Sequence, residues 1–245
     1  MDNEWFRDFF DGVAVDFWTA AAPPAGDDID FLKAVFGPPD GREVLDLACG
    51  AGRHAIPLSR AGYGMTAVDL SPAFLAMARK TAETAGVAVD WQRRDMRDLP
   101  WRGRFHGAIC MGNSFGYIGR AGTKDCVAAV ASALESGGSF VLDTGATAES
   151  LLPALQQRRW MEVADILFLS SASYDIAGSR LDVEYTFIRG DQREKKTAST
   201  SVFTVAELRE MFETSGFVIE GTYSSLERDP FRLGSPRLIL VARKR

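Results

Sequence analysis

The chain has 245 residues, of which 46% are hydrophobic and 25% are charged, and its formal net charge at pH 7 is −5. A chain of this length and composition folds as a globular protein with a substantial core. The acidic balance argues against a nucleic-acid partner, and no apolar stretch is long enough to span a membrane. Met1–Trp5 is acidic and aromatic, unlike a secretory signal peptide.

The three cysteines are Cys49, Cys110 and Cys126. Their number is odd and their spacing contains no C-x-x-C pair, so neither a disulfide framework nor a metal site is expected. Free cysteines are typical of a reducing compartment, and we therefore expect a cytoplasmic protein.

Residues 1–28 are expected to form an N-terminal helix or lid. Aromatic side chains recur there at helical spacing within residues 3–20, namely Trp5, Phe6, Phe9 and Phe10. The predicted amphipathic helix either packs on the body of the domain or covers a ligand, which then touches Phe17 or Trp18. Pro23 and Pro24 end this helix.

From residue 44 onwards, short apolar segments alternate with helical patterns. The predicted strands are residues 44–47, 65–69, 87–92, 105–111 and 139–143, and the predicted helices are residues 53–61, 72–86 and 123–134. Ser71 is a suitable N-cap with Pro72 at the first helical position, and Gly137-Gly138 is expected to form a turn. This alternation predicts a parallel sheet with helices on both faces.

Residues 159–203 show a different pattern. Three β-prone segments separated by turn residues predict a small antiparallel β insert: residues 166–169, 181–188 and 197–203. A capping box from Thr204 to Glu207 then starts a helix that runs to Ser215. Strands at 217–222 and 237–242 follow with no helix between them, so the last strand is expected to run antiparallel. We interpret residues 1–245 as a single domain.

The most informative stretch is the turn after the first strand, where Gly50 and Gly52 allow a ligand to approach the backbone closely. Such a turn at the start of a helix is typical of nucleotide-binding sites. Asp69 lies 19 residues after Gly50, where a carboxylate can bind ribose hydroxyls. This pattern also fits the loose fingerprint of a nicotinamide-dependent oxidoreductase, which is one alternative.

Three features favour a cationic adenosine derivative over a dinucleotide. Asp46, inside the first strand, repels a pyrophosphate but suits a cation. Asp95 and Met96 follow the third strand, where a carboxylate can bind the adenine amine and an apolar side chain can cover the adenine face. The antiparallel end of the chain is not part of a dinucleotide fold.

Four motifs occur in order, and together they resemble the class I S-adenosylmethionine-dependent methyltransferases: Asp46–Gly52, Val68–Pro72, Asp95–Pro100 and Gly112–Tyr117. The resemblance covers residues 29–245 and is closest to the bacterial small-molecule type with a β-rich insert. It implies an α/β, Rossmann-like, doubly wound seven-stranded sheet of order 3-2-1-4-5-7-6, with the last strand antiparallel. Ala48 replaces the family's first turn glycine, a change expected only to narrow the pocket.

The resemblance also implies S-adenosyl-L-methionine as the cofactor, with Asp69 at its ribose, Asp95 at its adenine amine and the glycine turn at its methionine part. The expected cofactor-binding residues are Trp18, Asp46, Ala48, Cys49, Gly50, Gly52, Arg53, Asp69, Leu70, Ser71, Asp95, Met96, Arg97, Met111, Gly112 and Asn113. Because the sulfonium is already electrophilic, we expect the protein mainly to position and desolvate the reactants.

The methyl group is expected to pass to N, O or C of a small molecule beyond the carboxyl ends of the parallel strands. Candidate catalytic residues are Tyr117 and Asp143, and candidate substrate-binding residues are Asn113, Tyr117, Tyr174, Tyr185 and Arg232. No nucleic-acid or membrane partner is expected, and the identity of the acceptor and the oligomeric state stay open. A non-catalytic binding module with the same fold is the second alternative.

Overall fold

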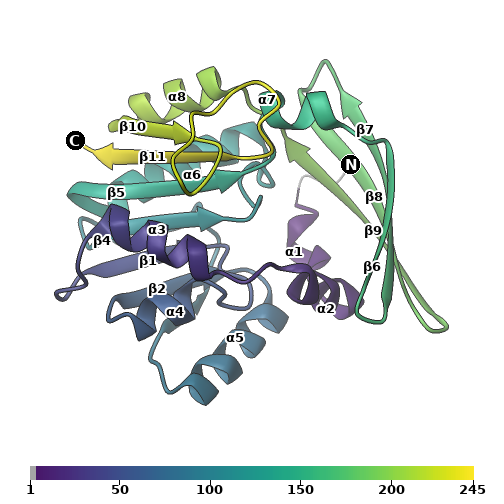
Figure 1. Ribbon diagram of the computed structural model, residues 1–245, viewed down its shortest axis with the longest axis horizontal. Coiled ribbons are helices and arrows are strands. Elements are labelled where there is room, and N and C mark those ends of the chain that lie inside the picture. The colour runs from purple at the N-terminus through teal and green to yellow at the C-terminus, as the bar shows by residue number, and fades with distance from the viewer. Residues whose placement is uncertain (1–3) are drawn as a thin grey trace.

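The computed structural model describes residues 4–245, so the first three residues of the predicted N-terminal segment lie outside it. Two β-sheets stand on either side of two N-terminal helices, α1 (Phe6–Phe9) and α2 (Gly12–Ala21) (Figure 1). The smaller sheet lies beyond the carboxyl ends of the parallel strands of the larger one. Ligands bind at that edge in open α/β sheets.

Seven strands form the larger sheet, in the order β10-β11-β5-β4-β1-β2-β3. Their bounds are β1 Glu43–Leu47, β2 Gly64–Asp69, β3 Asp90–Arg93, β4 Phe105–Met111, β5 Leu134–Thr144, β10 Phe217–Tyr223 and β11 Leu238–Lys244. β1 to β5 are parallel, whereas β11 pairs antiparallel with both β5 and β10. Counted within this sheet alone, the order is 3-2-1-4-5-7-6, which confirms the predicted topology.

Helices cover both faces of this sheet (Figure 1). They are α3 Gly26–Phe36, α4 Ala55–Arg60, α5 Pro72–Ala85, α6 Gly119–Ala133 and α8 Val205–Thr214, whereas α7 Ala148–Leu151 and the 3-10 turn Leu152–Ala154 connect β5 to the smaller sheet. Neighbouring residues of β1 serve opposite faces, since Val44 packs in the cluster with α3 and α4 and Leu45 in the cluster with α6 and α8. Within residues 4–245, no helix combines the length and the apolar character needed to cross a membrane.

Two helix starts follow the predicted capping chemistry. The Ser71 hydroxyl accepts the Phe74 N–H at 3.2 Å at the start of α5. Thr204 and Glu207 exchange hydrogen bonds in a capping box at the start of α8. Both caps satisfy backbone donors that a helix leaves free at its first turn, which is why the sequence locates these helix starts correctly.

The smaller sheet has four antiparallel strands in sequence order: β6 Arg158–Val163, β7 Ile166–Asp175, β8 Arg180–Arg189 and β9 Gln192–Ser201. β6 has no counterpart among the predicted strands because its residues are mostly exposed. Phe168 and Phe187 are paired and buried on the face toward α2. Trp160 and Leu169, paired on the other face, are exposed.

The prediction of one continuous N-terminal helix is wrong. The chain divides into α1 and α2 at Gly12, which takes a φ of +52°. Glu194 of β9 accepts the Val13 N–H at 3.0 Å, and a side chain at Gly12 would collide with that carboxylate. The predicted turn at Gly137-Gly138 is also wrong, because both residues lie within β5 near a register shift against β4.

Candidate active site

The turn between β1 and α4 bends the chain at the carboxyl edge of the sheet. Ala48, Gly50 and Gly52 have φ angles of 52°, 55° and 82°. A side chain at Gly52 would collide with Trp91, whereas one at Gly50 would meet no atom within 4 Å. The expectation for Ala48 needs correction, since its left-handed backbone costs about 1 kcal/mol relative to glycine in addition to any narrowing of the pocket.

Asp69, the last residue of β2, holds this turn in place. Its two carboxylate oxygens accept the N–H groups of Gly50 and Ser71, each at 2.8 Å. Burial raises the pKa of Asp69 although these backbone hydrogen bonds oppose the shift. The Ser71 hydroxyl in turn donates to the carbonyl of Phe10 at 2.7 Å. Leu70 lies in the same turn, between Asp69 and Ser71. Asp69 therefore organises two neighbouring turns and the approach of the N-terminal helices.

Asp46 of β1 lies two residues before Ala48 and is 1% exposed. Its Oδ2 atom has no hydrogen-bond partner among residues 4–245. Burial, and then the negative charge of Asp69, raise the pKa of Asp46 to about 8. A buried carboxylate oxygen without a partner is unfavourable unless a ligand satisfies it. A cation beside the turn does so, whereas a pyrophosphate adds repulsion.

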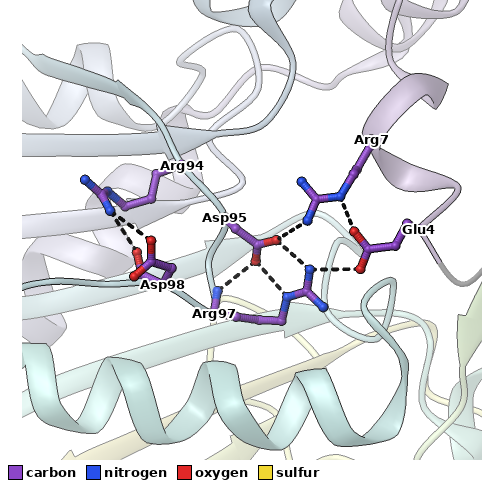
Figure 2. A network of polar contacts seen from close by, with 6 residues as sticks. All are labelled: Glu4, Arg7, Arg94, Asp95, Arg97 and Asp98. Atoms are coloured by element: carbon purple, nitrogen blue, oxygen red, sulfur yellow. Dashed lines mark hydrogen bonds and ion pairs between the residues drawn. The ribbon is translucent and has the colours of Figure 1, made fainter.

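Asp95, in the loop after β3, is the centre of an ion-pair network (Figure 2). Arg97 donates Nε to Oδ1 at 2.9 Å and Nη2 to Oδ2 at 2.6 Å, and Arg7 Nη2 lies 3.3 Å from Oδ2. Glu4 bonds to Arg7 and accepts Arg97 Nη2 at 3.0 Å. Burial opposes ionisation, but the hydrogen bonds from Arg97 lower the pKa of Asp95. The network fastens α1 to the loop that is expected to bind adenine.

The other expected cofactor-binding residues lie along the same edge. Cys49 is buried, and its N–H donates to the Val68 carbonyl at 3.0 Å. Met96 is buried next to Asp95, and Met111 ends β4. Gly112 and Asn113 follow it with positive φ angles, and a side chain at Gly112 would meet no atom within 4 Å.

A charged cluster near the glycine turn contains residues that the sequence interpretation missed. Asp28 of α3 is buried, and its Oδ2 accepts Arg53 Nη1 at 2.9 Å and lies 3.2 Å from His54 Nε2. Arg237, just before β11, lies 3.0 Å from Asp143 Oδ2 and 3.9 Å from Asp28 Oδ1. Burial raises the pKa of Asp143 to about 6, although Arg237 opposes the shift. Burial also lowers the pKa of His54, in keeping with a structural role.

Three aromatic side chains from different elements lie between the two sheets. The ring centroids of Trp18 (α2) and Tyr185 (β8) are 6.3 Å apart. Tyr117, in the loop after β4, lies 4.8 Å from Trp5. Burial raises the pKa of Tyr117 and raises that of Tyr185 to about 12, so neither phenol is an effective base at neutral pH.

The remaining candidate substrate residues are placed as follows. Asn113 Oδ1 accepts the Gly145 N–H at 2.5 Å, which joins the loops after β4 and β5. Tyr174 lies on the same face of the smaller sheet as Tyr185, but its hydroxyl is bonded to Ser179 at 3.0 Å at the end of the β7–β8 hairpin. Arg232 is exposed in the loop between β10 and β11. The structure thus brings Tyr117 and Tyr185 together but not Tyr174 or Arg232.

The fold agrees with the comparisons to known proteins. Residues 44–138 match the family model described as a methyltransferase domain. The chain is 31% identical to a glycine/sarcosine N-methyltransferase of Parasynechococcus marenigrum over 146 residues, which are 58% of this chain and 50% of the relative. It therefore spans about half the length of this curated relative.

Solved structures extend the similarity over the full fold. The CcbJ methyltransferase from Streptomyces caelestis superposes with a TM-score of 0.83 and 22% identity, and the match covers 100% of this chain and 99% of that one. An amino pentose methyltransferase from Micromonospora echinaspora has a TM-score of 0.69 and 20% identity, with coverage of 97% and 99%. Residues 44–138 thus match a methyltransferase domain, and the whole chain has the fold of S-adenosylmethionine-dependent methyltransferases of known structure, in agreement with the four sequence motifs.

The residues present fit S-adenosyl-L-methionine, the cofactor that the sequence motifs imply. Asp46 offers a buried carboxylate oxygen without a protein partner to a positive charge. Gly50, in the turn after β1, and Gly112, directly after the neighbouring strand β4, leave space that a side chain would occupy. A buried carboxylate with one free oxygen and two open glycines suit a bulky cation at this position.

Proposed function

We propose that the protein is an S-adenosyl-L-methionine-dependent methyltransferase that acts on a small molecule. The observation that carries the proposal is Asp46, a buried carboxylate with an unpartnered oxygen directly before the glycine turn. It is complementary to a positively charged ligand and hostile to a pyrophosphate. Asp69 and Asp95 follow at the next two strand ends, where their carboxylates suit ribose hydroxyls and an adenine amine.

The bound cofactor supplies a methyl group on an electrophilic sulfonium. Asp46 balances the positive charge, Asp69 keeps the turn in its binding conformation, and α1 and α2 exclude water beneath the smaller sheet. Tyr117 and Tyr185 stay protonated and act as hydrogen-bonding groups. Asp143, with a pKa of about 6, is the candidate that can take a proton near neutral pH if the acceptor must lose one.

Among N, O and C, we favour nitrogen as the accepting atom. One similar protein is named for N-methylation of glycine and sarcosine, and one similar structure is named for an amino pentose. We also propose that the N-terminal segment is a lid, which the Arg7–Asp95 contact supports, and that the protein is cytoplasmic, which its three free cysteines support. No comparison supports the oxidoreductase or the non-catalytic module.

The experiment is a calorimetric titration with S-adenosyl-L-methionine and with S-adenosyl-L-homocysteine, which lacks the sulfonium charge. We expect Asp46→Asn to weaken the first ligand about tenfold and the second by less, because only the first presents that charge. Asp191→Asn, in the exposed turn between β8 and β9, is the control. A wild-type protein that binds neither ligand contradicts the proposal.

Transfer itself is tested with cofactor labelled in its methyl group and a bacterial metabolite extract. The labelled product is identified by mass. Cofactor binding without a labelled product in any fraction would favour the non-catalytic module instead.

A further inference from the structure

Trp18 carries a buried hydrogen-bond donor without an acceptor. Its Nε1 atom has no partner among residues 4–245. By contrast, the indole N–H of Trp5 donates to the Ser199 carbonyl at 2.8 Å. An indole N–H can only donate, and a buried donor without an acceptor is unfavourable in a folded protein. A ligand atom that accepts this hydrogen bond explains why the donor is retained.

Two tyrosines from other elements of the fold, Tyr117 and Tyr185, pack against the same core cluster as Trp18. The Trp18 and Tyr185 rings are nearly perpendicular at 89°, with their centroids 6.3 Å apart. Burial is the largest cause that raises the pKa of Tyr117, and the nearby Tyr185 is the second. In the described part of the chain, neither hydroxyl has a hydrogen-bond partner. The three polar atoms therefore remain available to the same ligand.

Further aromatic rings pack against these three side chains. Phe9 lies 5.5 Å from Tyr185, and Phe10 stacks on Tyr117 at 6.2 Å with an interplanar angle of 24°. Phe168 lies 5.9 Å from Trp18. Aromatic surroundings of this kind favour a ligand with a ring or another broad apolar face, and a few polar groups fix its orientation.

The position of the group relative to the cofactor edge is also suitable. Tyr117 follows β4, the strand that pairs with β1, and β1 carries Asp46. Trp18 and Tyr185 come from α2 and β8, on the far side of that edge (Figure 1). Tyr117 thus follows a strand of the edge that carries Asp46, and Trp18 and Tyr185 belong to elements beyond that edge.

We propose that Trp18, Tyr117 and Tyr185 form the subsite for the methyl acceptor, and that it takes a ring-bearing molecule with an oxygen that accepts the Trp18 indole N–H. The two tyrosine hydroxyls bind further polar groups on the same ring. Trp18 then contacts the acceptor and not the cofactor, in contrast to what the family resemblance implies. The proposal rests on the proposed function for the chemistry of the occupant.

The first test reads the Trp18 N–H directly and needs no turnover. Protein labelled with ¹⁵N at tryptophan and loaded with S-adenosyl-L-homocysteine is titrated with phenol, D-glucosamine and glycine. We expect the indole signal that Trp18→Phe removes to shift with phenol or D-glucosamine and not with glycine. The Trp160 signal is the control, because that side chain is 73% exposed on the outer face. A Trp18 signal that no ring compound moves, or that glycine moves equally, overturns the proposal.

The second test uses the acceptor isolated by labelled-methyl transfer. Trp18→Phe keeps an aromatic ring but removes the indole N–H together with part of the ring surface, so we expect kcat/KM for that acceptor to fall about tenfold with unchanged cofactor affinity. Trp160→Phe is expected to change neither quantity. Loss of cofactor affinity in Trp18→Phe overturns the proposal, because Trp18 then belongs to the cofactor site. If the wild-type protein binds no S-adenosyl-L-homocysteine, the proposed function is wrong. The titration with phenol, D-glucosamine and glycine in the absence of S-adenosyl-L-homocysteine then still tests the subsite.

Discussion

The carboxylate of Asp69 accepts the backbone N–H of Gly50 at 2.8 Å, across two parallel strands. Its other oxygen accepts the Ser71 N–H, so one side chain fixes the turns after β1 and after β2. We expect Asp69→Ala to lower the free energy of unfolding by about 1–3 kcal/mol, because two partly buried donors lose their acceptor. We also expect affinity for S-adenosyl-L-methionine to fall by more than about tenfold, because the turn loses its shape.

Urea unfolding and calorimetry measure these two effects. Asp98→Ala is the matched control, since the Asp98 side chain lies in the loop after β3 and is 80% exposed. Equal cofactor affinity in Asp69→Ala and the wild type would show that Asp69 does not organise the site.

A substitution at Ala48 is expected to stabilise the protein, in contrast to Asp69→Ala. Its φ of +52° is strained for alanine and relaxed for glycine. We therefore expect Ala48→Gly to raise the free energy of unfolding by about 0.5–1 kcal/mol, less a part lost to the greater freedom of glycine in the unfolded chain. Ala51→Gly, in the same turn but without a positive φ, should be neutral or destabilising. The idea of strain at Ala48 fails if both substitutions have the same effect.

The larger sheet could be predicted because its signals are local. Apolar strands, the glycine turn, the Ser71 cap and the Thr204 capping box each act over a few residues, and their order then implies the topology. Breaks that depend on distant partners could not be predicted. Gly12 divides α1 from α2 where Glu194 approaches, and that carboxylate lies 181 residues away from Val13 in the sequence.

The candidate site likewise contains residues that the sequence could locate and residues that it could not. Asp46 and Asp69 are placed by the strands on which they lie, so the motifs locate them. Arg237 reaches Asp143 only through the register between β11 and β5, across 94 residues. No local pattern contains that register, and none shows that Asp28 is a buried partner of Arg53. Long-range ion pairs of this kind require the folded structure.

The network around Asp95 predicts unequal roles for its two arginines (Figure 2). Arg97 makes two side-chain bonds to Asp95 and one to Glu4, whereas Arg7 touches Asp95 at 3.3 Å with 45% of its side chain exposed. We expect Arg97→Ala to speed hydrogen exchange in α1 by more than about fivefold, and Arg7→Ala to change it by less than about twofold, because exposed ion pairs contribute little.

Hydrogen exchange followed by mass spectrometry measures this difference. Arg102→Ala, in the loop before β4, serves as the control because within residues 4–245 Arg102 bonds only to a carbonyl in its own loop. Equal protection of α1 in Arg97→Ala and the wild type would mean that packing of Phe6 and Phe9 alone holds the helix.

Asp46 predicts how the stability of the ligand-free protein depends on pH. Its pKa is about 8 in the folded protein, whereas an aspartate in an unfolded chain has a pKa of about 3.9. The folded state therefore holds a proton that the unfolded state releases between about pH 4 and about pH 8, so stability falls as the pH rises through that range. The contribution is fully present below about pH 4 and is lost above about pH 8, and its size is on the order of a few kcal/mol for so deeply buried a group.

The Asp46→Asn substitution keeps the shape of the side chain without a titrating proton, so urea unfolding of this variant between about pH 6 and about pH 8.5 should show a shallower fall than the wild type. Asp143 titrates near pH 6 and contributes mostly below this range, which leaves Asp46 to account for the upper part. S-adenosyl-L-methionine should reverse the effect in the wild type, because a bound cation stabilises the ionised carboxylate and drives release of its proton. Calorimetry in buffers of different ionisation enthalpy counts that proton. Identical pH profiles for Asp46→Asn and the wild type would show that Asp46 is already ionised in the ligand-free protein. Another group would then have to compensate its negative charge at the glycine turn.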